Sequence, residues 1–153
     1  MAVGGWNMGS PPFETITNSN ITMQKFVHSV LRFLQKYNLD GLDLDWEYPV
    51  GRKREFTNLC QLLRLAFNPY NHLLTAAVSA GTSNVENYYE PRKLYQLLDF
   101  INIMTYDFHG EWDTSTQGVS HHSPLNPRSD EKDWVRDFNV VSYIHIKLLS
   151  SAS

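Results

Sequence analysis

Apolar residues recur along this chain with two different periods, and the longer period predicts helices. Two stretches place apolar side chains three and four residues apart, which is typical of amphipathic helices. The first predicts a helix over roughly 21–37, and its apolar positions are Phe26, Val27, Val30, Phe33, Leu34 and Tyr37. The second predicts a helix that ends at Asn68-Pro69, and its apolar positions are Phe56, Leu59, Cys60, Leu63 and Phe67. A shorter helix is expected over 91–98.

Between these helices lie short, nearly continuous apolar runs, which are typical of buried parallel strands. They predict strands over 1–5, 41–47, 73–79 and 100–105, with a loop from the first strand to about residue 19. A long loop is expected from about 106 to 134, and a tail, for which a helix is one option, from about 139. Strands that alternate with helices every 30 to 40 residues predict an α/β fold with a parallel sheet and crossover helices.

One predicted strand differs from the others because it is rich in acids. Side chains alternate between the two faces of a strand, so this run has one acidic and one apolar face. The acidic face holds Asp43, Asp45 and Glu47, and the apolar face holds Leu42, Leu44 and Trp46. Crowded like charges repel, so at least one of these carboxyls is expected to remain protonated at neutral pH. Such an arrangement favours a proton-handling site, and we expect acid-catalysed bond cleavage.

The neighbouring residues have plainer interpretations. Trp46 alternates away from the acids, so it is expected to pack between sheet and helix. Asp40 stands at the start of the strand, where a structural role is favoured. Polar loops commonly follow parallel strands, which explains Asp107 well but does not explain acids inside a strand, such as Asp43 and Asp45.

The carboxyl ends of the predicted strands are where chemistry gathers in parallel α/β folds. Trp6 follows the first strand, Glu47 closes the second, and Tyr106 follows the fourth. Three strands therefore deliver polar or aromatic side chains to one edge of the sheet.

The composition of the chain argues against some kinds of binding partner. The chain has 153 residues, which suits one domain, and its formal net charge is −3 without a basic patch, so nucleic acid and anionic membranes are not expected partners. No apolar run is long enough to span a membrane, and the first residues do not resemble a signal peptide. Aromatic residues make up 13% of the chain, which suits stacking on sugar rings. The single cysteine, Cys60, is expected to be buried.

The acidic run carries a family resemblance. Asp40-Gly41-Leu42-Asp43-Leu44-Asp45-Trp46-Glu47-Tyr48-Pro49 resembles the D-G-x-D-x-D-W-E-x-P signature of family 18 glycosyl hydrolases, the chitinases. Gly4-Gly5-Trp6-Asn7, Ala77-Val78-Ser79-Ala80-Gly81 and the run from Met104 to Gly110 with Trp112 resemble further motifs of that family. The resemblance covers residues 1 to about 126 and is strongest to animal secreted chitinases. It divides the chain into a catalytic part, 1–138, and a divergent tail, 139–153.

The resemblance implies a fold and a mechanism. The family fold is a (β/α)8 barrel of about 250 residues, of which this chain is expected to supply strands three to six. Glu47 would act as acid and base, Asp45 would orient the substrate's acetamido group, and Asp43 would act through Asp45. Tyr106 would hydrogen-bond the acetamido oxygen. The substrate's own acetamido group would be the nucleophile, so configuration would be retained.

The resemblance also implies a ligand, chitin or chito-oligosaccharides, with an extracellular location and no cofactor. The expected substrate-binding residues are Gly4, Gly5, Trp6, Asn7, Tyr48, Met104, Asp107 and Trp112. No metal is expected, because His121-His122 lack spaced partners. The alternative is a catalytically inactive fragment that binds chito-oligosaccharides. A partial barrel would expose two strand edges, through which the chain could self-associate.

Overall fold

The structure is a computed structural model that describes residues 1–113, 115, 118–127, 129 and 139–140. It divides into two compact units, of which the first comprises Met1–Val78 with Val85–Ile103 and the second comprises Ser79–Asn84 with Met104–Ser153. Each unit is described by itself. Most of the predicted tail from residue 139 lies outside the described residues.

Four strands form one sheet, in the order β1 (Ala2–Gly4), β2 (Gly41–Asp45), β3 (Leu73–Ser79) and β4 (Phe100–Met104). β1 pairs with β2, and β2 with β3, in parallel, so the predicted α/β fold with a parallel sheet is confirmed. In this register Asp43 lies opposite Ala2 on one side and opposite Thr75 on the other. The sheet thereby places the acids of β2 between two neighbouring strands.

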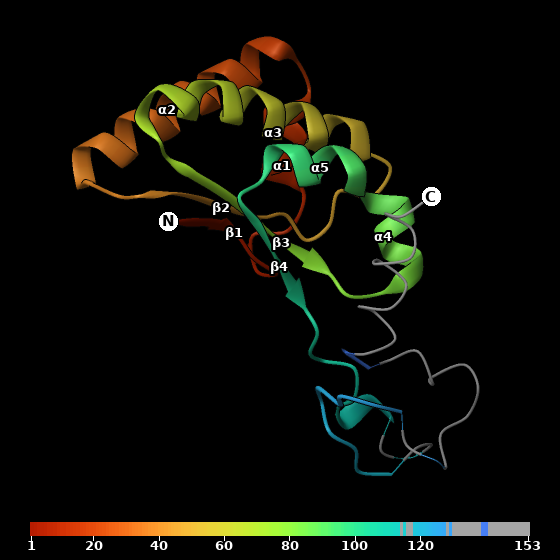
Figure 1. Cartoon of the computed structure of the whole chain (residues 1–153). Coiled ribbons are helices and arrows are strands. Elements are labelled where there is room, and N and C mark those ends of the chain that lie inside the picture. The colour runs from red at the N-terminus through yellow and green to blue at the C-terminus, as the bar shows by residue number, and fades with distance from the viewer. Residues whose placement is uncertain (114, 116–117, 128, 130–138, 141–153) are drawn as a thin grey trace. The chain divides into compact units, whose positions relative to one another are not determined.

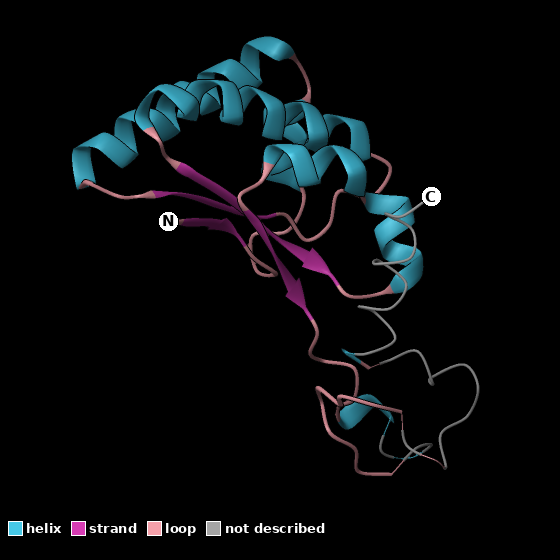
Figure 2. Ribbon diagram, in the orientation of Figure 1, coloured by secondary structure: helices cyan, strands magenta, loops and turns pink. Residues whose placement is uncertain are grey.

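The three predicted helices are present as α2 (Asn20–Tyr37), α3 (Lys53–Phe67) and α5 (Pro91–Leu97). Helix α2 begins with a capping box, in which Ser19 Oγ accepts a hydrogen bond from Thr22 N (3.2 Å) and Thr22 Oγ1 accepts one from Ser19 N (3.1 Å). It ends at Asn38, which adopts a left-handed conformation with φ 50°. Helices cover one face of the sheet, as Figures 1 and 2 show.

Two further helices are present, the first where a loop was predicted and the second where no element was predicted. They are α1 (Pro11–Thr17) and α4 (Thr82–Tyr88), and two 3-10 turns, Asn68–Tyr70 and Glu111–Asp113, are also present. The Pro-Pro pair at the start of α1 suggests a break in the chain, yet proline is favoured in a first helical turn. Strand β2 ends at Asp45, two residues earlier than predicted, so Glu47 follows the strand rather than lying within it.

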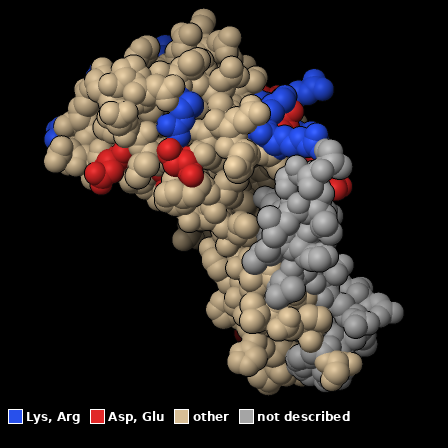
Figure 3. Space-filling model, viewed as in Figure 1, with Lys and Arg blue, Asp and Glu red and all other residues tan. Residues whose placement is uncertain are grey.

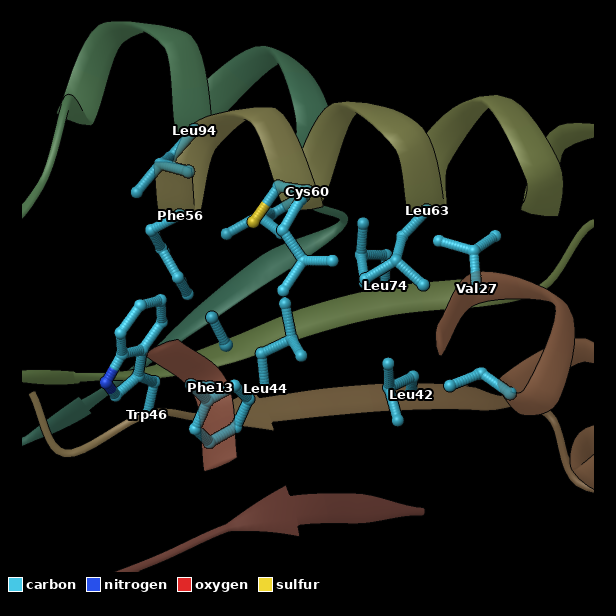
Figure 4. Packing of buried hydrophobic residues seen from close by; sticks show 14 of the residues in the cluster. Phe13, Val27, Leu42, Leu44, Trp46, Phe56, Cys60, Leu63, Leu74 and Leu94 are labelled. Carbon is cyan, nitrogen blue, oxygen red and sulfur yellow. The ribbon is translucent and has the colours of Figure 1, made fainter. Parts of the chain in front are cut away.

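The hydrophobic core lies between the sheet and its helices. In Figure 4, Leu42 and Leu44 of β2 and Leu74 of β3 point towards Cys60 and Leu63 of α3. Cys60 is fully buried, as predicted, and this burial raises the pKa of its thiol. The alternation of β2 is therefore confirmed: its leucines are buried against the helices, while Asp43 and Asp45 on the opposite face are only partly buried.

Charged side chains of both signs lie on the surface of the first unit. On the face seen in Figure 3, acidic and basic side chains of the first unit lie among uncharged ones. None of the described helices combines the length and the hydropathy that crossing a bilayer requires.

Candidate active site

Asp43 is held in place by two neighbouring strands. Thr75 of β3 donates its hydroxyl hydrogen to Asp43 Oδ1, and the side-chain amide of Asn102 in β4 donates to the same oxygen at 3.3 Å. Both donors come from strand positions on the same face as Asp43, because parallel register aligns alternate side chains across a sheet. The carboxylate of Asp43 is therefore fixed by hydrogen bonds before any ligand is bound.

Asp45 is the most perturbed of the three acids. Its Oδ1 is buried and makes no hydrogen bond within the described part of the chain. Burial raises the pKa of Asp45, and the negative charges of Glu47 and then Asp43 raise it further. This direction agrees with the prediction that crowding favours the protonated form of one acid. Asp45 is thus ready to hold a proton beside two other carboxyls.

Gly4 and Gly5 allow β1 to end directly against Asp45. Gly4 has φ +122°, and a Cβ on it would lie 1.9 Å from the Asp45 carbonyl oxygen. Gly5 N donates a hydrogen bond to the same carbonyl at 2.8 Å, and Gly5 has φ +94°. Glycine is needed here for close approach and for positive φ. These two predicted binding residues therefore shape the backbone around Asp45.

The residue after Asp45 is part of the core. Trp46 is 1% exposed and stacks on Phe13 of α1, with ring centroids 5.1 Å apart. Its indole Nε1 donates a hydrogen bond to Ser10 Oγ at 2.9 Å. The prediction that Trp46 packs between sheet and helix is confirmed.

Glu47 lies between two anchored neighbours. Tyr48 stacks on Tyr88 of α4 with ring centroids 5.9 Å apart, and its carbonyl oxygen accepts a hydrogen bond from Ser10 Oγ at 2.9 Å. The Glu47–Tyr48 peptide bond is cis. Sequence patterns did not identify Ser10, because a serine before two prolines is typical of an ordinary loop.

Trp6 and Asn7 follow β1 in the first unit. Trp6 is 74% exposed, and Asn7 is exposed as well. An exposed indole immediately beyond the carboxyl end of a strand is available for stacking, since no core contact requires its burial.

The remaining predicted site residues belong to the second unit. Met104 ends β4, and Tyr106 and Asp107 follow it. Asp107 has φ 56°, and its backbone N–H donates a hydrogen bond to His122 Nδ1 at 3.2 Å. The Tyr106 ring meets the His122 ring edge to face, with centroids 6.4 Å apart. His122 therefore orders the loop after β4.

Trp112 packs on the backbone of Gly110. A Cβ on Gly110 would lie 2.3 Å from the indole ring, yet Trp112 remains 68% exposed. Glycine at this position lets the ring lie flat against the chain. Across the described residues, no group of three or more His, Cys, Asp or Glu side chains could hold a metal ion.

Comparison with known proteins assigns the chain to a family. The profile of glycosyl hydrolases family 18 matches residues 1–152. Probable chitinase 2 of Drosophila melanogaster is 39% identical over 137 residues, which cover 86% of this chain and 28% of that protein. Chitotriosidase-1 of Mus musculus is 41% identical over 153 residues, which cover 92% of this chain and 32% of that protein.

Solved structures agree with this result. Human YKL-39, described as a pseudo-chitinase with retained chitooligosaccharide binding, superposes with a TM-score of 0.91 at 32% identity, over all of this chain and 44% of that one. An immunomodulatory active chitinase of Trichuris suis superposes with a TM-score of 0.87 at 36% identity. This match covers 94% of this chain and 40% of that one. The chain spans about a third or less of the two curated relatives above. It belongs to glycosyl hydrolase family 18.

Proposed function

We propose that this chain carries the catalytic acids of a chitinase-type domain that hydrolyses β-1,4-linked N-acetylglucosamine polymers. One observation carries the proposal: Asp43 and Asp45 lie on the face of β2 opposite the core with Glu47 just beyond the strand, and burial, the charge of Glu47 and then that of Asp43 raise the pKa of Asp45. A packing role would not use three carboxyls, whereas hydrolysis of a glycosidic bond uses one carboxylic acid as the proton donor and further carboxyls to orient and stabilise the substrate.

The geometry suits a retaining, substrate-assisted reaction. Glu47 donates its proton to the glycosidic oxygen, and the bond from that oxygen to the anomeric carbon breaks. The carbonyl oxygen of the substrate's 2-acetamido group bonds to the anomeric carbon and gives an oxazolinium ion. Asp45 holds the acetamido N–H and balances the positive charge. Glu47 then takes a proton from the water that opens the ion, so configuration is retained.

Spacing along the chain supports these separate roles. Asp43 and Asp45 lie two residues apart in β2, about 6.6 Å along the strand, and Glu47 follows two residues after the strand ends. Asp45 stands between Asp43 and Glu47 in the chain, so we propose that Asp43 acts on the substrate only through Asp45. The hydrogen bonds from Thr75 and Asn102 occupy Asp43, which fits this indirect role.

We propose the substrate-binding side chains from the family motifs of each unit. Trp6 and Trp112, both exposed, would stack on sugar rings, and Tyr106 would hydrogen-bond the acetamido oxygen. The further proposed contacts are Asn7, Tyr48, Met104 and Asp107. Gly4 and Gly5 would contribute through the backbone that they place beside Asp45.

We further propose that β1–β4 correspond to strands three to six of the (β/α)8 barrel, in an extracellular protein. The structural match to chitinases supports the barrel, and Ostrinia furnacalis chitinases solved with a chito-oligosaccharide or with allosamidin support an oligosaccharide ligand. Self-association through the edges of β1 and β4 is part of the same proposal.

A second candidate function is oligosaccharide binding without hydrolysis. This candidate is favoured by the similarity to human YKL-39, which is a pseudo-chitinase with retained chitooligosaccharide binding properties. The complete acidic triad of this chain favours the enzyme instead.

Glu47→Gln tests the proposal on a fluorogenic chitobioside. We expect turnover to fall at least 100-fold, because the general acid is lost, while calorimetric titration shows unchanged chito-oligosaccharide affinity. Glu55→Gln in α3 is the matched control and should keep its turnover. Unaffected turnover in Glu47→Gln would refute the assignment of the acid, and a wild-type chain that binds without turnover would establish the second candidate.

A further inference from the structure

Hydrogen bonds among the described residues do not set the position of the Glu47 side chain. Within the described part of the chain its carboxylate makes none, and its electrostatic partner is another acid, Asp45. A general acid must nevertheless be held within a fraction of an ångström of the bond that it protonates. The position of Glu47 must therefore come from the backbone on either side of it.

A single hydroxyl contacts both neighbours of Glu47. Ser10 Oγ accepts the indole hydrogen of Trp46 at 2.9 Å and donates its own hydrogen to the carbonyl oxygen of Tyr48 at 2.9 Å. One donor and one acceptor function are used, which suits a hydroxyl. The segment from Trp46 to Tyr48 is thereby tied to α1 at its two ends.

The Ser10 hydroxyl is available for these two hydrogen bonds because it does not cap its own helix. Ser10 is the N-cap residue of α1, and its carbonyl begins the helix through a 2.9 Å hydrogen bond from Glu14 N. A serine at this position normally caps the helix with its side chain, but this one makes no such bond. Pro11 and Pro12 occupy the first two helical positions, so one of the two usual partners of an N-cap side chain, the N–H of the second helical residue, is absent.

Aromatic rings connect the same two neighbours by a second route. Figure 4 shows Trp46 beside Phe13, with Phe56 on the other side of the indole. Consecutive ring centroids lie 5.1 to 6.3 Å apart along the series Phe13, Trp46, Phe56, Tyr89, Tyr88 and Tyr48. The series begins in α1 and returns to Tyr48, so packing and hydrogen bonding hold the same short segment.

We propose that Ser10 is a positioning residue for the general acid, because its hydroxyl bridges the two residues that flank Glu47. The inference rests on the proposed function, in which Glu47 protonates the substrate. Ser10 does not touch the reacting atoms. It fixes the backbone from which Glu47 projects, and its removal should affect the chemical step more than substrate binding.

Three variants separate this role from a merely structural one. Ser10→Ala removes the bridge, Ser10→Thr keeps a hydroxyl, and Ser19→Ala removes the N-cap hydroxyl of α2 without contacting the Glu47 segment. The first readout is the carbon-13 NMR signal of the Glu47 carboxyl, identified by its absence in Glu47→Gln. The second is kcat and KM on a fluorogenic chitobioside.

We expect Ser10→Ala to shift and broaden the Glu47 carboxyl signal and to lower kcat about tenfold with little change in KM. Ser10→Thr should restore both readouts, and Ser19→Ala should leave both at wild-type values. A Glu47 signal in folded Ser10→Ala that matches wild type would overturn the proposal and leave Ser10 as a partner for Trp46 alone. The signal is read without turnover, so failure of the proposed function, seen as unchanged hydrolysis by Glu47→Gln, is a separate outcome.

Discussion

At the scale of single residues, the acidic face of β2 was predictable, whereas its surroundings were not. Alternation alone assigns Asp43 and Asp45 to one face and Leu44 to the other, because the strand period is two. The hydrogen bonds from Thr75 and Asn102 join strands that are far apart in sequence, so no local pattern reveals them. Ser10 was missed for the same reason.

Asp45 should lower the stability of the fold at neutral pH. Burial raises its pKa, so the folded chain binds the proton more tightly than the unfolded chain, and stability falls as pH rises through the folded pKa. Asp45→Asn mimics the protonated form and should increase the free energy of unfolding at pH 7, by no more than about 1 kcal/mol after a discount for solvent screening, while abolishing turnover.

Urea unfolding at pH 7 and pH 4 measures this effect. The gain in the free energy of unfolding from Asp45→Asn should be smaller at pH 4, because protonation of the wild-type Asp45 carboxyl increases as pH falls. Asp40→Asn, at the exposed start of the same strand, should change stability by less than about 0.5 kcal/mol. A less stable Asp45→Asn at pH 7 would show that the charge of Asp45 is well accommodated.

At the scale of elements, periodicity identified α2 and α3 because each has a long apolar stripe. It missed α1, which has seven residues and buries only Phe13 and Thr17. The periodicity of apolar residues also could not predict contacts between elements. Asp99, just before β4, accepts hydrogen bonds from Leu74 N at 2.7 Å and from Arg64 Nη2 at 2.6 Å, and so joins β3 and α3.

Asp99 should stabilise the fold at neutral pH, with the opposite sign to Asp45. Burial opposes its charge, but the hydrogen bonds from Leu74 and Arg64 outweigh burial and lower the pKa of Asp99. Its contribution is therefore complete above the ordinary carboxyl pKa of about 3.9 and is lost as pH falls through the lowered value. Asp99→Asn should cost about 1 kcal/mol at pH 7, discounted for partial exposure.

The same urea series from pH 7 to pH 3 checks this prediction. The difference between wild type and Asp99→Asn should stay constant down to the ordinary carboxyl pKa of about 3.9 and should shrink as pH falls below it. A difference that stays constant over this range would mean that the charge of Asp99 contributes nothing and that its hydrogen-bond geometry accounts for the whole effect.

At the scale of the whole molecule, alternating elements predicted the parallel sheet, and the family motifs predicted the relatives. The sheet of the first unit has one face against helices and one face that carries the acids. A face with Asp43, Asp45, Thr75 and Asn102 is poorly suited to a hydrophobic core, since buried polar groups need partners. The fold therefore leaves this face polar, which is consistent with the proposed site.

The most direct test of the account is the stereochemistry of the first product. Proton NMR would follow the anomeric signals while the chain hydrolyses a chito-oligosaccharide, before mutarotation equilibrates them. Retention by the substrate's acetamido group predicts that the β-anomer of the new reducing end appears first. Initial release of the α-anomer, or no release at all, would contradict the claim that Asp45 and Glu47 form a substrate-assisted hydrolase site.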